Sequence, residues 1–205
     1  LSPAKPNNAI TLTAFGDWSI DSKGKLLSLT YNFFNRHTRS FSDVTTWQDE
    51  NDPTRLTDDG TNKYRIHSVK LDAALPFSAF RLDAGAAYTG VNNNTDLQVS
   101  DLLDGNRVTN TLQSNTFKYD EKTAAVYVSA EKSFSNSFFG KFGLRYEHTD
   151  VKGIQLIDNL RHDKSYGYLF PSLNLSWNSQ KAGRFSLSYS MGITRPNFGD
   201  LNPFR

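Results

Sequence analysis

The sequence predicts an all-β protein, an antiparallel up-and-down meander of about eight long strands. Three observations predict this fold. Apolar and polar residues alternate along most of the 205 residues, and a period of two turns successive side chains to opposite faces of a strand. No convincing helical period occurs, and no run of about eighteen apolar residues is long enough for a spanning helix. Turn-forming residues separate the alternating stretches, so consecutive strands are expected to form hairpins.

Composition excludes several classes of protein. The formal net charge of +2 provides no electrostatic basis for nucleic-acid binding, so we expect no nucleic-acid partner. Cysteine is absent, which rules out disulfides and thiolate metal sites. The mean hydropathy of -0.56 is too low for a helical membrane protein. The N-terminal LSPAKPNN lacks the basic and apolar parts of a signal peptide, so an exported protein would be represented here by a mature or excised piece.

Four strands are expected in the N-terminal half. The first, Ile10–Ile20, ends at the turn DSKGK, and the second covers Lys25–Phe34. The third, Tyr64–Leu75, turns tightly at PFSA into the fourth, Phe80–Tyr88. In each strand, one face carries mostly apolar side chains and the other mostly hydroxyl groups, amides and charges.

Four more strands follow in the C-terminal half, over Glu121–Phe134, Phe139–Thr149, Tyr168–Trp177 and the alternating stretch that begins at Arg184. In the fifth strand we assign the alternate residues from Ala124 to Ala130 to the apolar face. Short turns at SNS and NSQKAG join the strands in pairs. Pro171 lacks the N–H group of a strand residue, so we expect a bulge or an irregular start in the seventh strand.

The connections between strands alternate in length. Short turns alternate with long polar stretches, which cover about residues 35–63, 91–118 and 150–165 and are expected to be loops. In an up-and-down meander, alternate connections lie at opposite ends of the sheet. One end of the sheet is therefore expected to have short turns and the other to have long loops, which is typical of outer-membrane barrels.

The polar face favours a wide lumen over a packed interior. Charges buried singly cost several kcal/mol each, whereas charges in a wet or plugged lumen stay solvated or paired. Strands of about nine to eleven residues also suit a tilted bilayer crossing. We therefore predict part of a transmembrane β-barrel. The charged residues expected to face its lumen are Lys70, Asp72, Arg81, Asp83, Arg145 and Glu147.

The apolar face is expected to meet outer-membrane lipid. Aromatic residues near strand ends are typical of the girdles at the two membrane interfaces. The candidates for this lipid-facing girdle are Trp18, Tyr31, Phe33, Tyr88, Tyr146, Trp177 and Tyr189. Two alternatives remain: a small self-contained outer-membrane barrel acting as an adhesin, and a soluble lipocalin-like barrel whose apolar face binds an apolar ligand inside.

The C-terminal segment TRPNFGDLNPF resembles the R-P-x-x-x-D-L-N-P-F segment of TonB-dependent outer-membrane receptors of the Bacteroidetes type. The stretches Phe142–Gly153 and Tyr168–Trp177 are also similar to consecutive strands of that family, in the same order. Two prolines in the motif lack ladder donors, and its arginine and aspartate can pair, so we expect a structural role at a strand end. The motif residues are Arg195, Pro196, Asp200, Leu201, Asn202, Pro203 and Phe204.

This resemblance implies a larger parent protein in the bacterial outer membrane. It implies a 22-stranded barrel with a plugged lumen, of which residues 1–205 would form one part of a single barrel domain. The plug domain and the barrel-closing C-terminal strands are expected to be absent from this stretch. The implied function is energy-coupled uptake of an unknown nutrient, with the plug and TonB engaged through other parts of the parent chain.

Sequence motifs for other chemistry are missing. No G-x-S-x-G, P-loop or H-E-x-x-H occurs, and the histidines have no metal-binding spacing, so we expect no enzyme, no cofactor and no metal. Arg36, His37 and Arg39 form a small basic cluster beside a strand end. We interpret it as a solubilising rim, with contact to lipopolysaccharide phosphates as the alternative.

Overall fold

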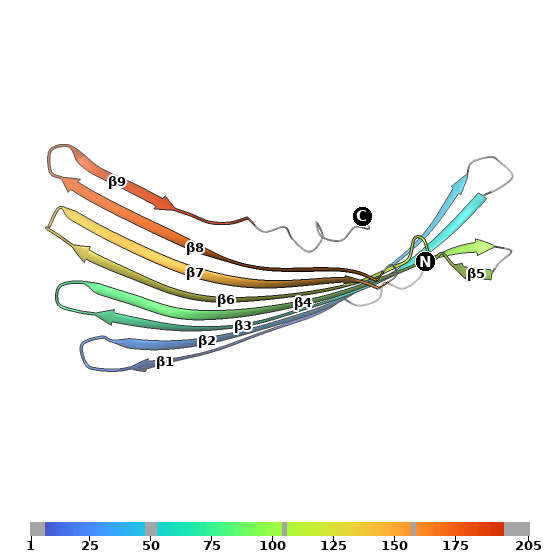
Figure 1. The fold of residues 1–205 in the computed structure, drawn as a ribbon, viewed down its shortest axis with the longest axis horizontal. Helices are drawn as coiled ribbons and strands as arrows, with labels where there is room; N and C mark the ends of the chain where they lie inside the picture. The colour runs from blue at the N-terminus through green and yellow to red at the C-terminus, as the bar shows by residue number, and fades with distance from the viewer. Residues whose placement is uncertain (1–6, 48–52, 104–105, 157–158, 195–205) are drawn as a thin grey trace.

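The computed structural model describes residues 7–47, 53–103, 106–156 and 159–194, and nearly all of them belong to one antiparallel sheet (Figure 1). Each strand lies beside its sequence neighbour in the order β1-β2-β3-β4-β6-β7-β8-β9, and the short β5 pairs with β4. The predicted antiparallel meander is confirmed. The strands are β1 (Asn8–Ser19), β2 (Leu26–Trp47), β3 (Pro53–Pro76), β4 (Arg81–Leu103), β5 (Asn106–Thr109), β6 (Asn115–Ser133), β7 (Phe138–Gln155), β8 (Leu160–Ser179) and β9 (Gly183–Ser190).

Tight turns join the strands in pairs at one end of the sheet, the left end in Figure 1. Gly24 and Gly183 adopt φ values of 88° and 89°, a backbone conformation that a residue with a Cβ rarely adopts. In the first turn, the Asp21 carboxylate accepts hydrogen bonds from the backbone N–H groups of Lys23 and Lys25, at 3.0 and 3.1 Å. The turns expected at DSKGK, PFSA, SNS and NSQKAG are all confirmed.

At the opposite end, the strands are much longer than expected. β2 and β3 pair without interruption from Leu26 opposite Ala74 to Trp47 opposite Pro53, and β7 and β8 pair in the same way up to Gln155 opposite Leu160. β4 pairs with β6 up to Leu97 opposite Asn115, and beyond that with the short β5. The polar stretches expected as loops are therefore mostly strand, and the expected length of nine to eleven residues is wrong. Backbone pairing alone satisfies the ladder hydrogen bonds, so a strand does not need an apolar face wherever both of its faces meet water.

The two faces of the sheet differ in exposure. Directly opposed residues of paired strands point to the same face, so the register assigns each side chain to one of two faces. In β6, Val126 is 57% exposed on the face that we call the outer face, whereas Ala125 on the other, inner face is 4% exposed. The described residues form no second layer, so this difference arises from curvature of the sheet, with the inner face concave. The assignment of alternate residues in the fifth expected strand is correct.

The sheet is open within the described residues. β1 pairs with β2 and β9 pairs with β8, and no pairing joins β1 to β9. The bulge expected at Pro171 is absent from the β7–β8 ladder, where Leu144 stands directly opposite Pro171. The Pro171 carbonyl accepts a hydrogen bond from the Met191 N–H group at 3.1 Å, just beyond the end of β9. The edge of Pro171 that lacks an N–H donor therefore points away from β7, so the β7–β8 ladder loses no hydrogen bond there. The described part of the chain has no helix of the length and apolarity needed to cross a membrane.

Candidate functional site

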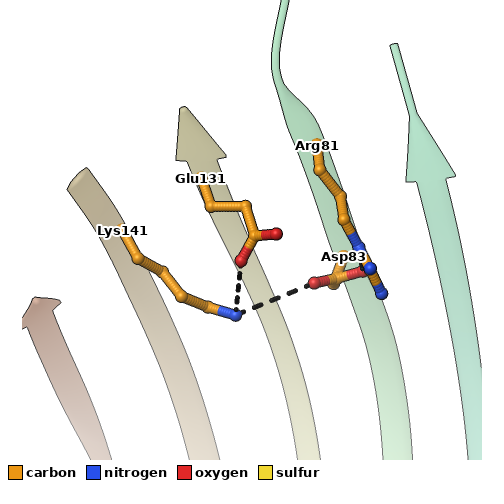
Figure 2. A network of polar contacts seen from close by, with 4 residues as sticks. All are labelled: Arg81, Asp83, Glu131 and Lys141. Atoms are coloured by element: carbon orange, nitrogen blue, oxygen red, sulfur yellow. Dashed lines mark hydrogen bonds and ion pairs between the residues drawn. The ribbon is translucent and has the colours of Figure 1, made fainter. Parts of the chain in front are cut away.

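The inner face near the tight turns carries a network of opposite charges drawn from three strands (Figure 2). On β4, the Arg81 guanidinium donates to the Asp83 carboxylate at 2.9 Å. Lys141 of β7 reaches across, with its Nζ 3.1 Å from a Glu131 oxygen on β6 and 3.9 Å from Asp83. Each of these side chains stays partly exposed, so the network belongs to a wet surface and not to a dry core.

A second group of inner-face charges surrounds the ring of Tyr127, further along β6 and β7, and includes residues of β3. The Tyr127 hydroxyl donates to the Asp72 carboxylate, which also lies 2.9 Å from the Lys70 ammonium. The guanidinium of Arg145 lies 5.3 Å from the centre of the Tyr127 ring and 2.6 Å from a Glu147 oxygen. The Lys70 ammonium of β3 lies 5.7 Å from the centre of the same ring, so Tyr127 of β6 attracts cations of two different strands through cation–π interactions.

The structure therefore brings together all six residues expected to face the lumen. They lie on the inner face, each in an ion pair, and two interactions reach across an intervening strand, from Tyr127 of β6 to Asp72 of β3 and from Lys141 of β7 to Asp83 of β4. Glu131 and Lys141 complete the network in Figure 2, although the sequence did not single them out. Charges that balance one another in this way suit a hydrated wall. No cluster of three or more metal-ligating His, Cys, Asp or Glu side chains occurs among the described residues.

Aromatic side chains cover the inner face further from the tight turns. Phe117 and Tyr119 of β6 are buried against Val151 of β7, and Tyr166 of β8 packs beside them. The Tyr119 hydroxyl donates to the Glu121 carboxylate at 2.5 Å. Burial, reinforced by this carboxylate, raises the pKa of Tyr119, so its hydroxyl remains a donor at neutral pH.

The sequence interpretation missed this aromatic cluster because its residues fall within or beside stretches that were expected to be loops. The alternation of Phe117, Tyr119 and Glu121 is the signal that predicts a strand there. Phe15 and Phe170 also lie on the inner face, opposite Thr30 and Arg145, so this face is more aromatic than the sequence suggested.

The far ends of the hairpins are held by paired charges. In the β2–β3 hairpin, the Arg55 guanidinium donates to both Asp43 carboxylate oxygens, at 2.8 and 2.5 Å. This pair lowers the pKa of Asp43 and raises that of Arg55. Arg107 of β5 lies over the ring of Phe41, 5.7 Å from its centre, and so connects the next hairpin to this one. The hairpins thus extend as ordered structure at the right in Figure 1.

The outer face carries all seven residues proposed for the aromatic girdle. Tyr31 and Tyr88 both stand opposite Val69, so they share one row across the sheet, and Trp18 and Trp177 lie near the tight turns. The apolar residues between these positions are exposed. Leu187 is 60% and Tyr189 is 56% exposed, which contradicts a dry interior built from this face.

The seven motif residues between Arg195 and Phe204 lie outside the described residues. Their expected structural role at a strand end therefore stays a prediction.

One protein-family model and several solved structures match this chain. The model described as "Outer membrane protein beta-barrel family" matches residues 18–205. The comparison with curated proteins gave no match.

Among solved structures, the ferric yersiniabactin uptake receptor FyuA from Yersinia pestis is similar in fold, with a TM-score of 0.60 and 13% identity over 84% of this chain and 26% of that chain. The ferric-catecholate import receptor Fiu from E. coli K12 gives a TM-score of 0.58 with 11% identity, over 90% of this chain and 35% of that chain. The ferric preacinetobactin receptor BauA from Acinetobacter baumannii gives 0.51 with 13% identity, over 85% of this chain and 29% of that chain. This chain thus spans about a quarter to a third of these receptors.

Proposed function

We propose that this chain, which belongs to the outer membrane protein beta-barrel family, forms part of the barrel wall of a TonB-dependent receptor for energy-coupled nutrient uptake. Family membership places the chain in the bacterial outer membrane. The resemblance of its sequence to outer-membrane receptor barrels agrees with the family match and with the folds of FyuA and Fiu. That the receptor takes up a nutrient, and that it contains a plug domain and further barrel strands outside this chain, are parts of the proposal.

The observation that carries the proposal is the orientation of the sheet. Exposed apolar side chains cover the outer face between Trp18 and Tyr31, while the inner face carries paired charges around Tyr127 and Lys141. An apolar surface that contacts no other layer is stable against hydrocarbon, and a charged concave surface is stable against water or a polar plug. A wall of a large, hydrated or plugged barrel has these two faces.

Two regions of the inner face would then serve different purposes. The charge network near the tight turns would contact the plug domain, because its paired groups can exchange partners with a polar protein surface. The aromatic cluster around Tyr119 and the hairpin ends lie on the side away from these turns and would contribute to the nutrient-binding surface. FyuA and Fiu are described as uptake and import receptors for ferric ligands, so uptake is the activity we assign.

Chemical labelling tests which end of the sheet faces the outside of the cell: the end with the long hairpins should be extracellular, and the end with the tight turns should face the periplasm. The chain contains no cysteine, so a single cysteine introduced at Gln113 or at Asn136 reports on one end of the sheet. In the full-length protein, with any cysteines outside this chain replaced, a membrane-impermeant maleimide should label Gln113→Cys on intact cells. It should label Asn136→Cys only after the outer membrane is permeabilised. Labelling of Asn136→Cys on intact cells would contradict the orientation.

Uptake itself is tested with cells that lack the gene for the full-length protein. They are given a defined mixture of ferric siderophores, haem, cobalamin, oligosaccharides and peptides, and the depletion of each compound is measured. At least one compound should be depleted more slowly than by the parent strain, and removal of TonB should produce the same defect. Equal depletion of every compound, or uptake that persists without TonB, would contradict the proposal.

A further inference from the structure

A basic hollow lies on the outer face, beyond the row that contains Tyr31 and Tyr88. Its volume is about 470 Å³, and it extends over the four consecutive strands β2, β3, β4 and β6. Its lining includes four basic residues, which are His37, Lys63, Arg65 and Lys118. A second hollow of about 330 Å³ shares His37 and Lys63 with it and adds Arg39. The structure divides the basic cluster seen in the sequence, because His37 and Arg39 point to the outer face and Arg36 to the inner face.

The position of the hollow matches the headgroup layer of a bilayer. On β2, the outer-face residues change from aromatic at Tyr31 and Phe33 to polar at Asn35 and His37. Asn35, opposite Arg65, follows Phe33 by two positions, and His37, opposite Lys63, follows it by four. These positions lie about 7 and 13 Å further along the strand, or about 5 and 9 Å along the membrane normal at a tilt near 45°. The polar headgroup layer on each side of the hydrocarbon core is about 5–8 Å deep. Side chains as long as lysine and arginine reach into this layer from just above it.

The cations of the hollow have no anionic partner in the described part of the chain. Lys63, Arg65 and Lys118 make no ion pair there, in contrast with the inner-face network of Figure 2. The carboxylate of Asp120, which also lines the hollow, accepts a hydrogen bond from the Asn92 amide. A second nearby carboxylate, that of Asp96, accepts one from the Thr116 hydroxyl at 2.5 Å.

A polar atom of the lining also lacks a partner. The Nε2 atom of His37 is buried and forms no hydrogen bond within the described structure. The amides of Asn35 and Asn94 add further donors around the cations. Ammonium, guanidinium and amide groups around a recess at headgroup depth are the groups that bind a phosphate.

We propose that this hollow binds a phosphate group of an outer-leaflet lipid headgroup and so fixes the barrel wall against the lipid. The inference rests on the orientation in the proposed function, with the long hairpins on the extracellular side. The lipid phosphate is held by Lys63, Arg65 and Lys118 together, with His37 in the wall of the hollow. The phosphate stays attached to its lipid, because the apolar part of the same molecule lies against the outer face below the hollow.

The test uses the full-length protein purified in detergent and compares three forms. The first is the parent protein, and the second carries Lys63→Gln, Arg65→Gln and Lys118→Gln. The matched control carries Lys23→Gln, Lys181→Gln and Arg184→Gln, which remove the same charge from exposed positions at the tight turns. The affinity of each form for purified lipopolysaccharide is measured. Dephosphorylated lipopolysaccharide and inorganic phosphate are tested as comparison ligands.

The triple variant in the hollow should bind lipopolysaccharide about a hundredfold more weakly than the parent, since each basic residue near an anionic lipid surface contributes roughly fivefold. The control variant should bind as the parent does, and dephosphorylated lipopolysaccharide should bind the parent as weakly as the intact lipid binds the triple variant. Equal affinity of the parent and triple variant would overturn the proposal. Saturable binding of inorganic phosphate without retention of the lipid would assign the hollow to a soluble anion and would also overturn it.

Folding of each variant is checked by the heat-dependent mobility of the protein in gels. If the triple variant fails to fold, the single variant Arg65→Gln should weaken binding about fivefold, and the charge-preserving pair Lys63→Arg and Lys118→Arg should retain parental affinity. Nutrient uptake is also measured in cells that produce the parent protein. If the parent protein does not bind the lipid but the cells take up the nutrient, the phosphate site fails and the proposed function stands. If the parent protein binds the lipid but the cells show no TonB-dependent uptake, the proposed function fails.

Discussion

Tyr127 and Gly85 stand directly opposite each other on β6 and β4, and the tyrosine ring lies over the glycine. A Cβ added at Gly85 would come within 2.4 Å of the Tyr127 ring and hydroxyl, and within 2.6 Å of the Leu71 backbone oxygen. The missing side chain of Gly85 is therefore what allows Tyr127 to reach Asp72 across β4. An aromatic ring that covers a glycine of the neighbouring strand also shields the backbone there.

Gly85→Ala should lower the free energy of unfolding by about 2 kcal/mol, because the added methyl group displaces the Tyr127 ring or the β3 backbone. The measurement is urea unfolding of the full-length protein in lipid vesicles. Gly90→Ala, on the same strand, is the control, because its Cβ would meet only ordinary contacts of 3.7 Å and more. Equal stability of the two variants would contradict the close packing of Tyr127 on Gly85.

Val126→Arg should lower the free energy of unfolding in lipid vesicles by about 2–4 kcal/mol, because the outer face near the middle of β6 meets hydrocarbon in the proposed barrel. Ser129→Arg adds the same side chain to the inner face of that strand and should change stability by less than about 1 kcal/mol. In water, a position as exposed as Val126 would tolerate arginine. If both variants are equally stable, the outer face does not face lipid.

The pair of Lys141 and Glu131 should contribute little to stability despite its place at the centre of the charge network. Both side chains are partly exposed, and pairs of this kind contribute about 0.5 kcal/mol in double-mutant cycles. The cycle combines Lys141→Met and Glu131→Gln and measures unfolding at low and high salt. The coupling should shrink as salt rises. A coupling above about 2 kcal/mol would show that the network is a buried structural element instead of a hydrated surface.

The end of the β2–β3 hairpin should loosen in acid. Hydrogen bonds from Arg55 lower the pKa of Asp43, with partial burial as the main opposing effect. A carboxylate with a lowered pKa stabilises the folded state above its unfolded pKa, and this contribution is lost as the pH falls through the lower, folded value. Below about pH 4, hydrogen-exchange protection of residues 41–47 and 54–57 should fall. Asp43→Asn should have low protection there at every pH. A parent protein whose protection does not change down to pH 2 would contradict this role for the pair.

The sequence was sufficient to predict the parts of the fold where hydrophobicity alternates. From Leu27 to Phe33, and again from Phe142 to Tyr146, one face must be apolar, so the period of two is visible. The turns could be predicted from their own chemistry, as at Gly24, where φ is positive. The inner-face charges, such as Lys70 and Arg145, followed from the same alternation.

The hairpin extensions could not be predicted in the same way. Beyond Phe33 the outer face of β2 carries Asn35, His37 and Arg39, so polar residues occupy both faces and the apolar period disappears. The strand persists because its backbone is paired and because neighbours such as Phe34 and Tyr64 make contacts on the inner face. Which cations of the outer face share a hollow depends on the register between β2, β3, β4 and β6, which no single strand specifies.

The uninterrupted pairing of β2 with β3 up to Trp47 has a consequence for selectivity. In the proposed barrel, a ladder that continues past the bilayer would make the outer part of the wall a stiff collar, whose diameter is set by the strands below it. Solutes would then be sieved by size at a rim well above the lipid, before any loop encloses them. Evolution can adjust such a rim by lengthening or shortening hairpins two residues at a time, which preserves the face that each side chain occupies.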